Sequence, residues 1–329
     1  MTATAAGSAA AIEADLAARF AASLARLLPG AAGSIGQAPI GLAVSGGADS
    51  LALLLLMQAT RPGGYAVAAV DHGLRPEAAA ECAAVADLCG ERGVSCAVLR
   101  VTPAAGNVQA AARDARYAAL AGWAAEHGLC AIATGHHADD QAETLLMRLN
   151  RGSGLAGLAG VRASGLVPGT ALPLLRPLLG FRRQELAWLV AAHGLSPAAD
   201  PSNSDRRFDR VRIRQAIGQA DWLDAAALAD SAAHLAQAAA ALDWAGQREW
   251  AERVEPIDGS LRYRPQAPRA IRLVVASRAI AALGQPPRGG DVARLLDRLE
   301  AGGSGNVAGV LARATADGWL FSPEPPRSR

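Results

Sequence analysis

The sequence contains no lysine, so all 32 residues counted as lysine or arginine are arginines. This absence excludes mechanisms that need a protein lysine, such as Schiff-base chemistry or the lysine of Walker-type and kinase-type phosphate sites. Cysteine is scarce as well, and the four cysteines form no Cys-x-x-Cys pair: Cys82, Cys89, Cys96 and Cys130. Buried, reduced thiols are therefore favoured over a disulfide framework or a metal site.

Long hydrophobic runs are missing too, although 51% of the residues are hydrophobic. The longest aliphatic run, Leu51–Met57, is far shorter than the ~20 residues of a membrane helix. Residues 1–10 hold no basic side chain ahead of an apolar stretch, which argues against a signal peptide. We therefore expect a cytoplasmic protein that makes no contact with a membrane.

Charge is unevenly distributed along the chain. The formal net charge is +2, but residues 262–329 carry 11 arginines against five acids, a local excess of +6. A basic C-terminal part on a mildly acidic remainder suits a polyanionic partner, and a solvated basic surface is the alternative.

Strands and helices alternate through the first half of the sequence. The length of 329 residues suggests about two domains. Apolar strands are predicted at residues 40–44, 65–70, 95–101 and 130–134, with helices between and after them. Because these strands are apolar almost throughout, they indicate a parallel sheet covered by helices on both faces. The expected fold class is α/β, with a doubly wound, Rossmann-like parallel sheet.

This pattern divides the chain into three parts. Residues 1–39 hold a helix and a linker, and residues 40–217 hold the α/β domain. Residues 218–329 are expected to form a smaller, mainly helical C-terminal domain. A helix is predicted up to Val254, and strands only around residues 307–311 and 318–321.

Polar clusters follow three of the predicted strands. Ser45-Gly-Gly-Ala-Asp-Ser50 follows the first strand, Asp71-His-Gly73 the second and Gly135-His-His-Ala-Asp-Asp140 the fourth. Ligands of open parallel sheets bind outside the carboxyl ends of the strands. The clusters therefore predict an active site at this edge of the sheet.

The first cluster has the properties of a phosphate-binding loop. Its glycines let the backbone approach a ligand closely, and N–H groups at a helix start attract anions. Asp49 is suited to hold a phosphate-bound magnesium ion, and an ordinary tight turn is the alternative. The dinucleotide fingerprint and the Walker pattern are both absent. The nucleotide-binding candidates in this loop are Ser45, Gly46, Gly47, Ala48, Asp49 and Ser50.

Together with further motifs, this loop resembles one enzyme family. The hexapeptide is typical of the ATP pyrophosphatase superfamily, and the later motifs follow in matching order and spacing: Val70–Arg75, Arg113–Tyr117, Gly135–Thr144 and Asp200–Asn203. From residue 40 to about residue 214 the chain is similar to the tRNA(Ile)-lysidine synthase family. The resemblance implies a carbon–nitrogen ligase that uses ATP and Mg²⁺. Free L-lysine would be joined to C2 of the wobble cytidine in the isoleucine tRNA with a CAU anticodon, through an adenylated cytidine, releasing pyrophosphate and AMP.

The motifs also supply candidate site residues. The catalytic candidates are Asp49, Asp139, Asp140 and Glu143. The last three suit lysine binding or proton transfer, although acids in a first helical turn also favour the helix dipole. By resemblance, the nucleotide-binding candidates outside the loop are His72, Arg113, Arg116 and His136. The tRNA-binding candidates are Arg206, Arg207, Arg210 and Arg214. Solvated arginines without a ligand are the alternative, and Val211 stands where the family usually has Asn.

Two other functions stay open at this point. A sulfur-inserting tRNA enzyme of the same superfamily would need catalytic cysteines or an iron–sulfur cluster, which the seven-residue spacing of Cys82, Cys89 and Cys96 does not suggest. A nucleotide-binding module without catalysis would not require the clustered acids Asp139, Asp140 and Glu143. The C-terminal domain is expected to position the tRNA, and the sequence leaves the oligomeric state open, a homodimer included.

Overall fold

The structure, a computed structural model, describes residues 3–28, 38–73, 75–102, 108–198 and 209–324. It divides into two compact units. The N-terminal unit comprises residues 1–147 and 161–232, and the C-terminal unit comprises residues 148–160 and 233–329. The division after Ala232 lies inside helix α9, Ala225–Arg253, whereas the sequence pattern places a boundary after residue 217.

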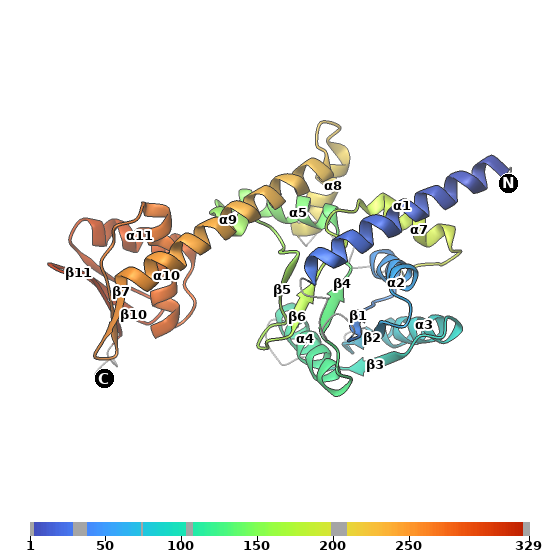
Figure 1. The fold of residues 1–329 in the computed structure, drawn as a ribbon, viewed down its shortest axis with the longest axis horizontal. Coiled ribbons are helices and arrows are strands. Elements are labelled where there is room, and N and C mark those ends of the chain that lie inside the picture. The colour runs from blue at the N-terminus through green and yellow to red at the C-terminus, as the bar shows by residue number, and fades with distance from the viewer. Residues whose placement is uncertain (1–2, 29–37, 74, 103–107, 199–208, 325–329) are drawn as a thin grey trace. The chain divides into compact units, whose positions relative to one another are not determined.

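The N-terminal unit is built on a six-stranded sheet with the order β3-β2-β1-β4-β6-β5 (Figure 1). Its strands are β1 Ile40–Ala43, β2 Tyr65–Asp71, β3 Cys96–Arg100, β4 Ala131–Thr134, β5 Ser164–Leu166 and β6 Pro173–Leu175. All neighbouring strands are parallel except β5, which pairs antiparallel with β6 at the edge. The predicted doubly wound parallel sheet is confirmed, and the antiparallel edge strand is an addition to it.

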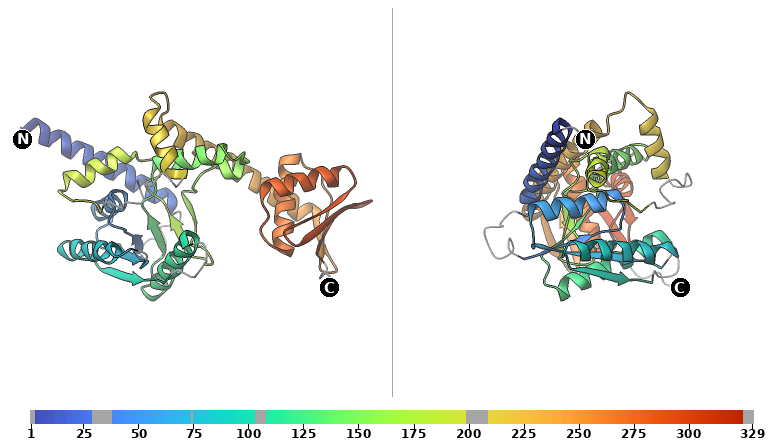
Figure 2. Two further views of the ribbon diagram at one scale, coloured as in Figure 1. Left: turned by 180° about the vertical axis from the view of Figure 1, so that it is seen from behind. Right: turned by 90° about the vertical axis from the view of Figure 1, so that its right-hand side faces the viewer.

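Helices cover both faces of this sheet, as the views of Figure 2 also show. Side chains from α1, α2, α3 and α7 pack on one face, and side chains from α4 pack on the other. The helices of this unit, apart from α9, are α1 Ala3–Leu27, α2 Ala48–Thr60, α3 Glu77–Glu91, α4 Val108–Glu126, α5 Ala138–Leu149, α7 Arg183–Ala192 and α8 Asp209–Gln219. Helix α2 is buried from Ser50 to Met57, because a helix that is apolar all round belongs in the core.

The chain order reverses between the two central strands, β1 and β4, which are buried along their whole length. This reversal brings the loops that follow β1 and β4 together, as expected at a topological switch point. Gly135 allows a close approach: a Cβ there would lie 3.0 Å from the backbone carbon and oxygen of Asp49. Any side chain at residue 135 would therefore push the two loops apart.

The C-terminal unit has its own core, between two helices and an antiparallel sheet with the order β7-β8-β11-β10-β9. Besides α6 Leu155–Leu158 and the end of α9, its elements are β7 Val254–Ile257, β8 Ser260–Tyr263, α10 Arg269–Leu283, α11 Gly289–Glu300, β9 Ser304–Val307, β10 Val310–Thr315 and β11 Gly318–Pro323. Helix α11 has a clear apolar stripe, and Val292, Leu295, Leu296 and Leu299 of that stripe are buried.

Two features of this sheet correct the sequence-based expectation. The hairpin β7–β8 turns at Asp258 and Gly259, both with positive φ, and the Asp-Gly pair that favours such turns is present in the sequence. The single strand expected around residues 307–311 is interrupted by a turn at Ala308 and Gly309, again with positive φ, which joins β9 to β10. The strand expected at residues 318–321 is confirmed in β11. A sheet thus accompanies the helices in this unit.

Within the described part of the chain, no helix is both long enough and apolar enough to cross a membrane.

Candidate active site

The loop between β1 and α2 is held in shape by its own hydrogen bonds. The Ser45 N–H donates to Ser50 Oγ at 3.1 Å, and the Ser50 hydroxyl donates to the Gly47 carbonyl at 2.8 Å. Gly46 has a φ of +83°, a left-handed conformation that suits glycine. The loop therefore forms the strand–turn–helix arrangement expected of a phosphate site at the start of a helix.

Two adjoining cavities open beside this loop. The larger, of about 480 Å³, has a size typical of ligand sites, and the smaller has about 180 Å³. The residues that line both are Ala43, Ser45, Gly47, Asp49, Arg116 and His136. His72 and Arg113 line only the larger cavity, and Ser50, Asp140 and Arg210 line only the smaller one. The structure thus brings most of the predicted nucleotide candidates together around one space.

The wall of the larger cavity includes small apolar residues from the sheet and a buried thiol. Ala43, Ala68 and Val70 come from the central strands, and Cys82 comes from α3. Burial, together with the nearby charges of Asp71 and Glu81, raises the pKa of the Cys82 thiol to about 11. Cys82 is therefore a neutral, weakly reactive thiol at neutral pH.

Asp49 meets the requirement for a magnesium ligand. Its Oδ1 is buried and has no hydrogen-bond partner among the described residues. The described residues also include no cluster of three or more His, Cys, Asp or Glu side chains that could enclose a metal ion. A cation here would therefore be held by one carboxylate together with substrate phosphates and water, which is how Mg²⁺ is usually bound.

His137 lies at the centre of three carboxylates. Its Nε2 is 3.3 Å from Asp49 Oδ2 and 3.8 Å from Asp140 Oδ2, and its Nδ1 is 3.5 Å from Asp139 Oδ2. Burial alone would lower the pKa of His137, but the neighbouring carboxylates of Asp139, Asp49 and Asp140 raise it to about 10. The buried Nδ1 atom itself has no hydrogen-bond partner among the described residues. The ring is therefore a buried imidazolium at neutral pH.

Asp139 connects this histidine to a second helix. Its Oδ2 accepts a hydrogen bond of 2.9 Å from the backbone N–H of Arg183, the first residue of α7. Burial raises the pKa of Asp139, but the adjacent His137 ring and the hydrogen bond from the Arg183 N–H outweigh this effect and lower the pKa overall. Asp139 lines neither cavity, so its visible contacts are with His137 and the start of α7.

Two predicted tRNA-binding arginines lie against predicted catalytic acids. Arg214 Nε is 2.5 Å from Glu143 Oε1, and Arg210 Nε is 2.7 Å from Glu143 Oε2. Arg210 also reaches Asp140 Oδ1 at 3.0 Å. Glu143 is only 1% exposed, so two guanidinium groups compensate a buried charge. Val211, between them in α8, is buried, which explains an apolar residue at this position.

Two predicted tRNA-binding residues and one family motif lie outside the described residues: Arg206, Arg207 and Asp200–Asn203.

His136 differs from its neighbour in charge. Its Nδ1 is 2.9 Å from Thr134 Oγ1. Burial lowers the pKa of His136 to about 4, and the positive charges of Arg176, Arg210 and Arg116 lower it further against the opposing effect of Asp140. His136 is therefore neutral at neutral pH, and it lines both cavities.

A residue that the sequence reasoning missed is Arg176, which follows β6 and is 8% exposed. It donates from Nη1 to the Arg162 carbonyl at 2.7 Å, while its buried Nε has no hydrogen-bond partner among the described residues. Arg113 and Arg116 lie 5.1 and 6.0 Å from the ring centre of Tyr117. Tyr117 is thus the common neighbour of Arg113, Arg116 and Arg176, and only the tertiary structure brings Arg176 to this place.

Fold and loop together define the class of protein: residues 16–221 match the family model described as a PP-loop domain. The chain is 52% identical to a tRNA(Ile)-lysidine synthase of Novosphingobium aromaticivorans, over 86% of this chain and 88% of that protein. It is 39% identical to a tRNA(Ile)-lysidine synthase of Zymomonas mobilis, over 88% of this chain and 90% of that protein. The chain belongs to the tRNA(Ile)-lysidine synthase family.

A solved structure shares the fold. The U34-tRNA thiolase NcsA of Methanococcus maripaludis, determined with its [4Fe-4S] cluster, matches with a TM-score of 0.52. The identity is 17%, over 67% of this chain and 78% of that chain. At this identity the match supports a common fold alone.

The contacts of Arg210 and Arg214 with the buried Glu143 carboxylate predict that two arginines of α8 differ in their effect on stability. Replacing Arg214 with Gln removes a charged partner from a buried carboxylate, so we expect a loss of about 1.5–3 kcal/mol in unfolding free energy. Arg212 pairs with Asp209 at the surface, and Arg212→Gln should change stability by less than about 1 kcal/mol. Urea denaturation of the full chain measures the unfolding free energy of both variants. Equal losses would contradict a stabilising contact between Arg214 and Glu143.

The low pKa of His136 predicts a pH-dependent stability. Because its pKa falls from 6.5 in the unfolded chain to about 4 in the folded chain, the unfolded state binds the proton first as pH falls. The associated stability is present above pH 6.5 and is lost as the pH falls towards 4. Between pH 7 and pH 5, the wild-type unfolding midpoint should therefore drop more than that of His136→Gln. Parallel curves would show that His136 does not titrate in this way.

Proposed function

We propose that the chain joins free L-lysine to C2 of the wobble cytidine in the isoleucine tRNA with a CAU anticodon, using ATP. The observation that carries this proposal is the wall shared by the two cavities. Ser45, Asp49 and His136 line both the larger cavity and the smaller one, which also holds Asp140. An activated phosphate and an attacking amine could therefore meet at this wall. We propose that the reaction takes place in the cytoplasm, because it would use ATP and tRNA.

The larger cavity would take the nucleotide. Its apolar side, with Ala68 and Val70, suits a base, and the β1–α2 loop suits the polyphosphate. The C2 carbonyl oxygen of the cytosine would attack the α-phosphorus of ATP, and pyrophosphate would leave. Bound to Asp49, Mg²⁺ would neutralise charge on the polyphosphate. Arg113 and Arg116 line the same cavity and would stabilise the negative charge that develops during the transfer.

The smaller cavity would take the reacting amine. In the second step the ε-amine of lysine attacks C2, the C2–O bond breaks and AMP leaves with the cytidine oxygen. Asp140 lines this cavity, whereas Asp139 and Glu143 line neither. We therefore assign Asp140 to contact with the amine. Asp139 would act through His137, and Glu143 would act by holding Arg210 and Arg214 in place.

A sulfur-transfer function receives less support from the cysteines. Cys82 and Cys89 are buried, and the Cys82 thiol, which lines the larger cavity, has a raised pKa. Sulfur chemistry at a cysteine requires an accessible thiolate or a metal-bound one. The described residues provide neither an accessible thiolate in the cavities nor a cysteine cluster for iron.

The direct test measures incorporation of labelled lysine into an unmodified isoleucine CAU tRNA, with ATP, Mg²⁺ and a methionine tRNA as control. We expect label on the isoleucine tRNA only, and Asp49→Ala should reduce it by about 100-fold or more because polyphosphate charge is no longer neutralised. AMP release without labelled tRNA would favour another adenylating reaction such as sulfur transfer. ATP binding with neither product would leave a nucleotide-binding module.

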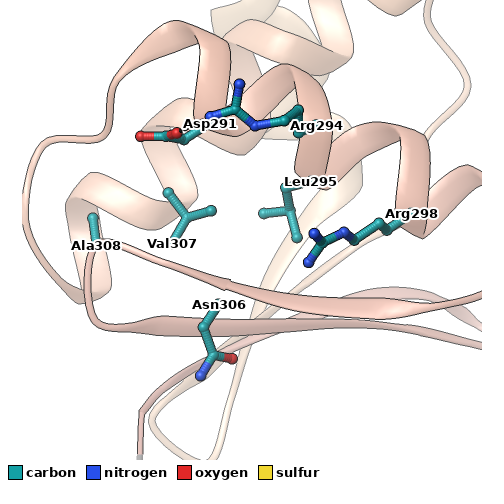
Figure 3. Close-up of a pocket in the computed structure, with 7 residues that line it drawn as sticks. All are labelled: Asp291, Arg294, Leu295, Arg298, Asn306, Val307 and Ala308. Atoms are coloured by element: carbon teal, nitrogen blue, oxygen red, sulfur yellow. Dashed lines mark hydrogen bonds and ion pairs between the residues drawn. The ribbon is translucent and has the colours of Figure 1, made fainter.

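We also propose that the C-terminal unit contacts the phosphate backbone of the tRNA. Helix α11 places Arg294 and Arg298 one turn apart beside a cavity of about 240 Å³ (Figure 3). Arg294 pairs with Asp291 at 2.5 Å, and Figure 3 shows Arg298 at the opposite end of the cavity from that acid. Arginines that are not held by acids are available to neutralise phosphates.

The salt dependence of tRNA binding tests this contact. If Arg298 neutralises one phosphate, Arg298→Gln should weaken binding and reduce the slope of log K against log salt by about 1. Arg269 is engaged by Asp297 and Glu300 at 2.6 Å each, so Arg269→Gln is the matched control and should leave the slope unchanged. Filter binding at several salt concentrations gives both slopes. An unchanged slope in Arg298→Gln would remove this arginine from the interface.

A further inference from the structure

His137 links the nucleotide loop to the acidic helix start by contacts on both sides of its ring. On one side, Nε2 lies 3.3 Å from Asp49 Oδ2, at the start of α2. On the other side, Nδ1 lies 3.5 Å from Asp139 Oδ2, in the first turn of α5, which is an ion-pair contact without hydrogen-bond geometry. The side chain is only 3% exposed, so water does not compete for these contacts. One buried ring therefore bridges two loops that come from different strands.

The bridge continues through the backbone on the α5 side. The His137 N–H donates to Asp140 Oδ2 at 3.1 Å, which fixes the carboxylate that lines the smaller cavity. Asp139 in turn accepts from the Arg183 N–H at 2.9 Å, which ties the same network to α7. The path from Asp49 to α7 is thus a continuous chain of polar contacts within one unit.

Electrostatics explains why a bridge is needed at this place. Like charges held close together disfavour their ionised forms. Asp49, Asp139 and Asp140 all approach the same ring, within 3.8 Å at most. Without a group between them, these side chains would move apart or change protonation. A residue that contacts a metal ligand also fixes the orientation of that ligand. Loss of such a contact typically lowers metal affinity or activity about 10–100-fold.

We propose that His137 is a positioning residue that couples the two halves of the reaction. Its Nε2 side would set the Asp49 carboxylate for the cation and ATP, and its Nδ1 side would set Asp139 and the α5 start for lysine. This inference rests on the proposed function, and it adds a residue that touches no substrate cavity itself. If His137 served only in folding, loss of the Nε2 contact and loss of the Nδ1 contact would have the same effect on the reaction.

Two substitutions of His137 test the contacts of its two ring nitrogens separately. The amide nitrogen of Asn can take the position of Nδ1, and that of Gln the position of Nε2. In His137→Asn an N–H donor stays beside Asp139 while the contact with Asp49 is lost. We expect the Mg²⁺ concentration for half-maximal adenylation to rise about 10-fold or more, with a smaller change in the lysine KM. His137→Gln should show the reverse, a raised lysine KM with nearly normal Mg²⁺ dependence.

Two activity assays and one binding assay, which does not depend on turnover, test these expectations. Pyrophosphate release with tRNA and ATP reports adenylation, and labelled lysine reports the second step. Calorimetric binding of a non-hydrolysable ATP analogue, with and without Mg²⁺, reports the nucleotide site alone, and the Mg²⁺-dependent gain in affinity should shrink in His137→Asn. His193→Gln is the matched control: it removes another histidine–carboxylate pair, with Glu13 at 3.0 Å, and should behave as wild type.

The possible results are distinct. Opposite shifts in the two variants support the inference. Equal defects in both variants, no defect in either, or loss of the cooperative thermal transition in either would overturn it and leave His137 with a structural role or none. If wild-type protein itself incorporates no lysine, the proposed function fails, and the calorimetric comparison still decides whether His137 supports the cation site.

Discussion

The close approach of the loop after β4 to the first turn of α2 is the contact on which the site depends. Gly135 makes it sterically feasible, since a Cβ there would lie 3.0 Å from the Asp49 backbone. The loop then carries His136 into the wall shared by both cavities and His137 against Asp49. Without this contact the phosphate loop would remain, but the acids of α5 would not face it.

Arginine supplies all the permanent positive charge of this protein, and the structure uses it in two ways. In α8, Arg210 and Arg214 surround the buried carboxylate of Glu143, where a planar guanidinium can donate from several N–H groups at once. Beside the phosphate loop, Arg113, Arg116 and Arg176 gather around Tyr117. Of these, Arg176 and Arg116 lower the pKa of His136, together with burial and Arg210. The first set compensates acids of the protein, and the second set leaves positive charge for an anionic ligand.

The adjacent histidines show how much the folded environment decides. His136 and His137 are neighbours in sequence and both are removed from water, yet their pKa values move in opposite directions, to about 4 and about 10. His136 faces a hydroxyl and three arginines, whereas His137 faces three carboxylates. Since backbone geometry turns successive side chains to different surroundings, no local pattern in the sequence distinguishes them.

The sequence by itself determined the parallel sheet, the phosphate loop and the family, because apolar periodicity and short-range turn chemistry are local properties. It also placed Asp140 and the loop residues beside one cavity, since the carboxyl ends of parallel strands meet at one edge. Only the tertiary structure decided that Arg210 and Arg214 contact Glu143, that His137 bridges Asp49 and Asp139, and that β8 pairs with β11 in the C-terminal sheet. These outcomes depend on contacts between residues that are far apart in the chain. A local sequence pattern does not reveal such contacts.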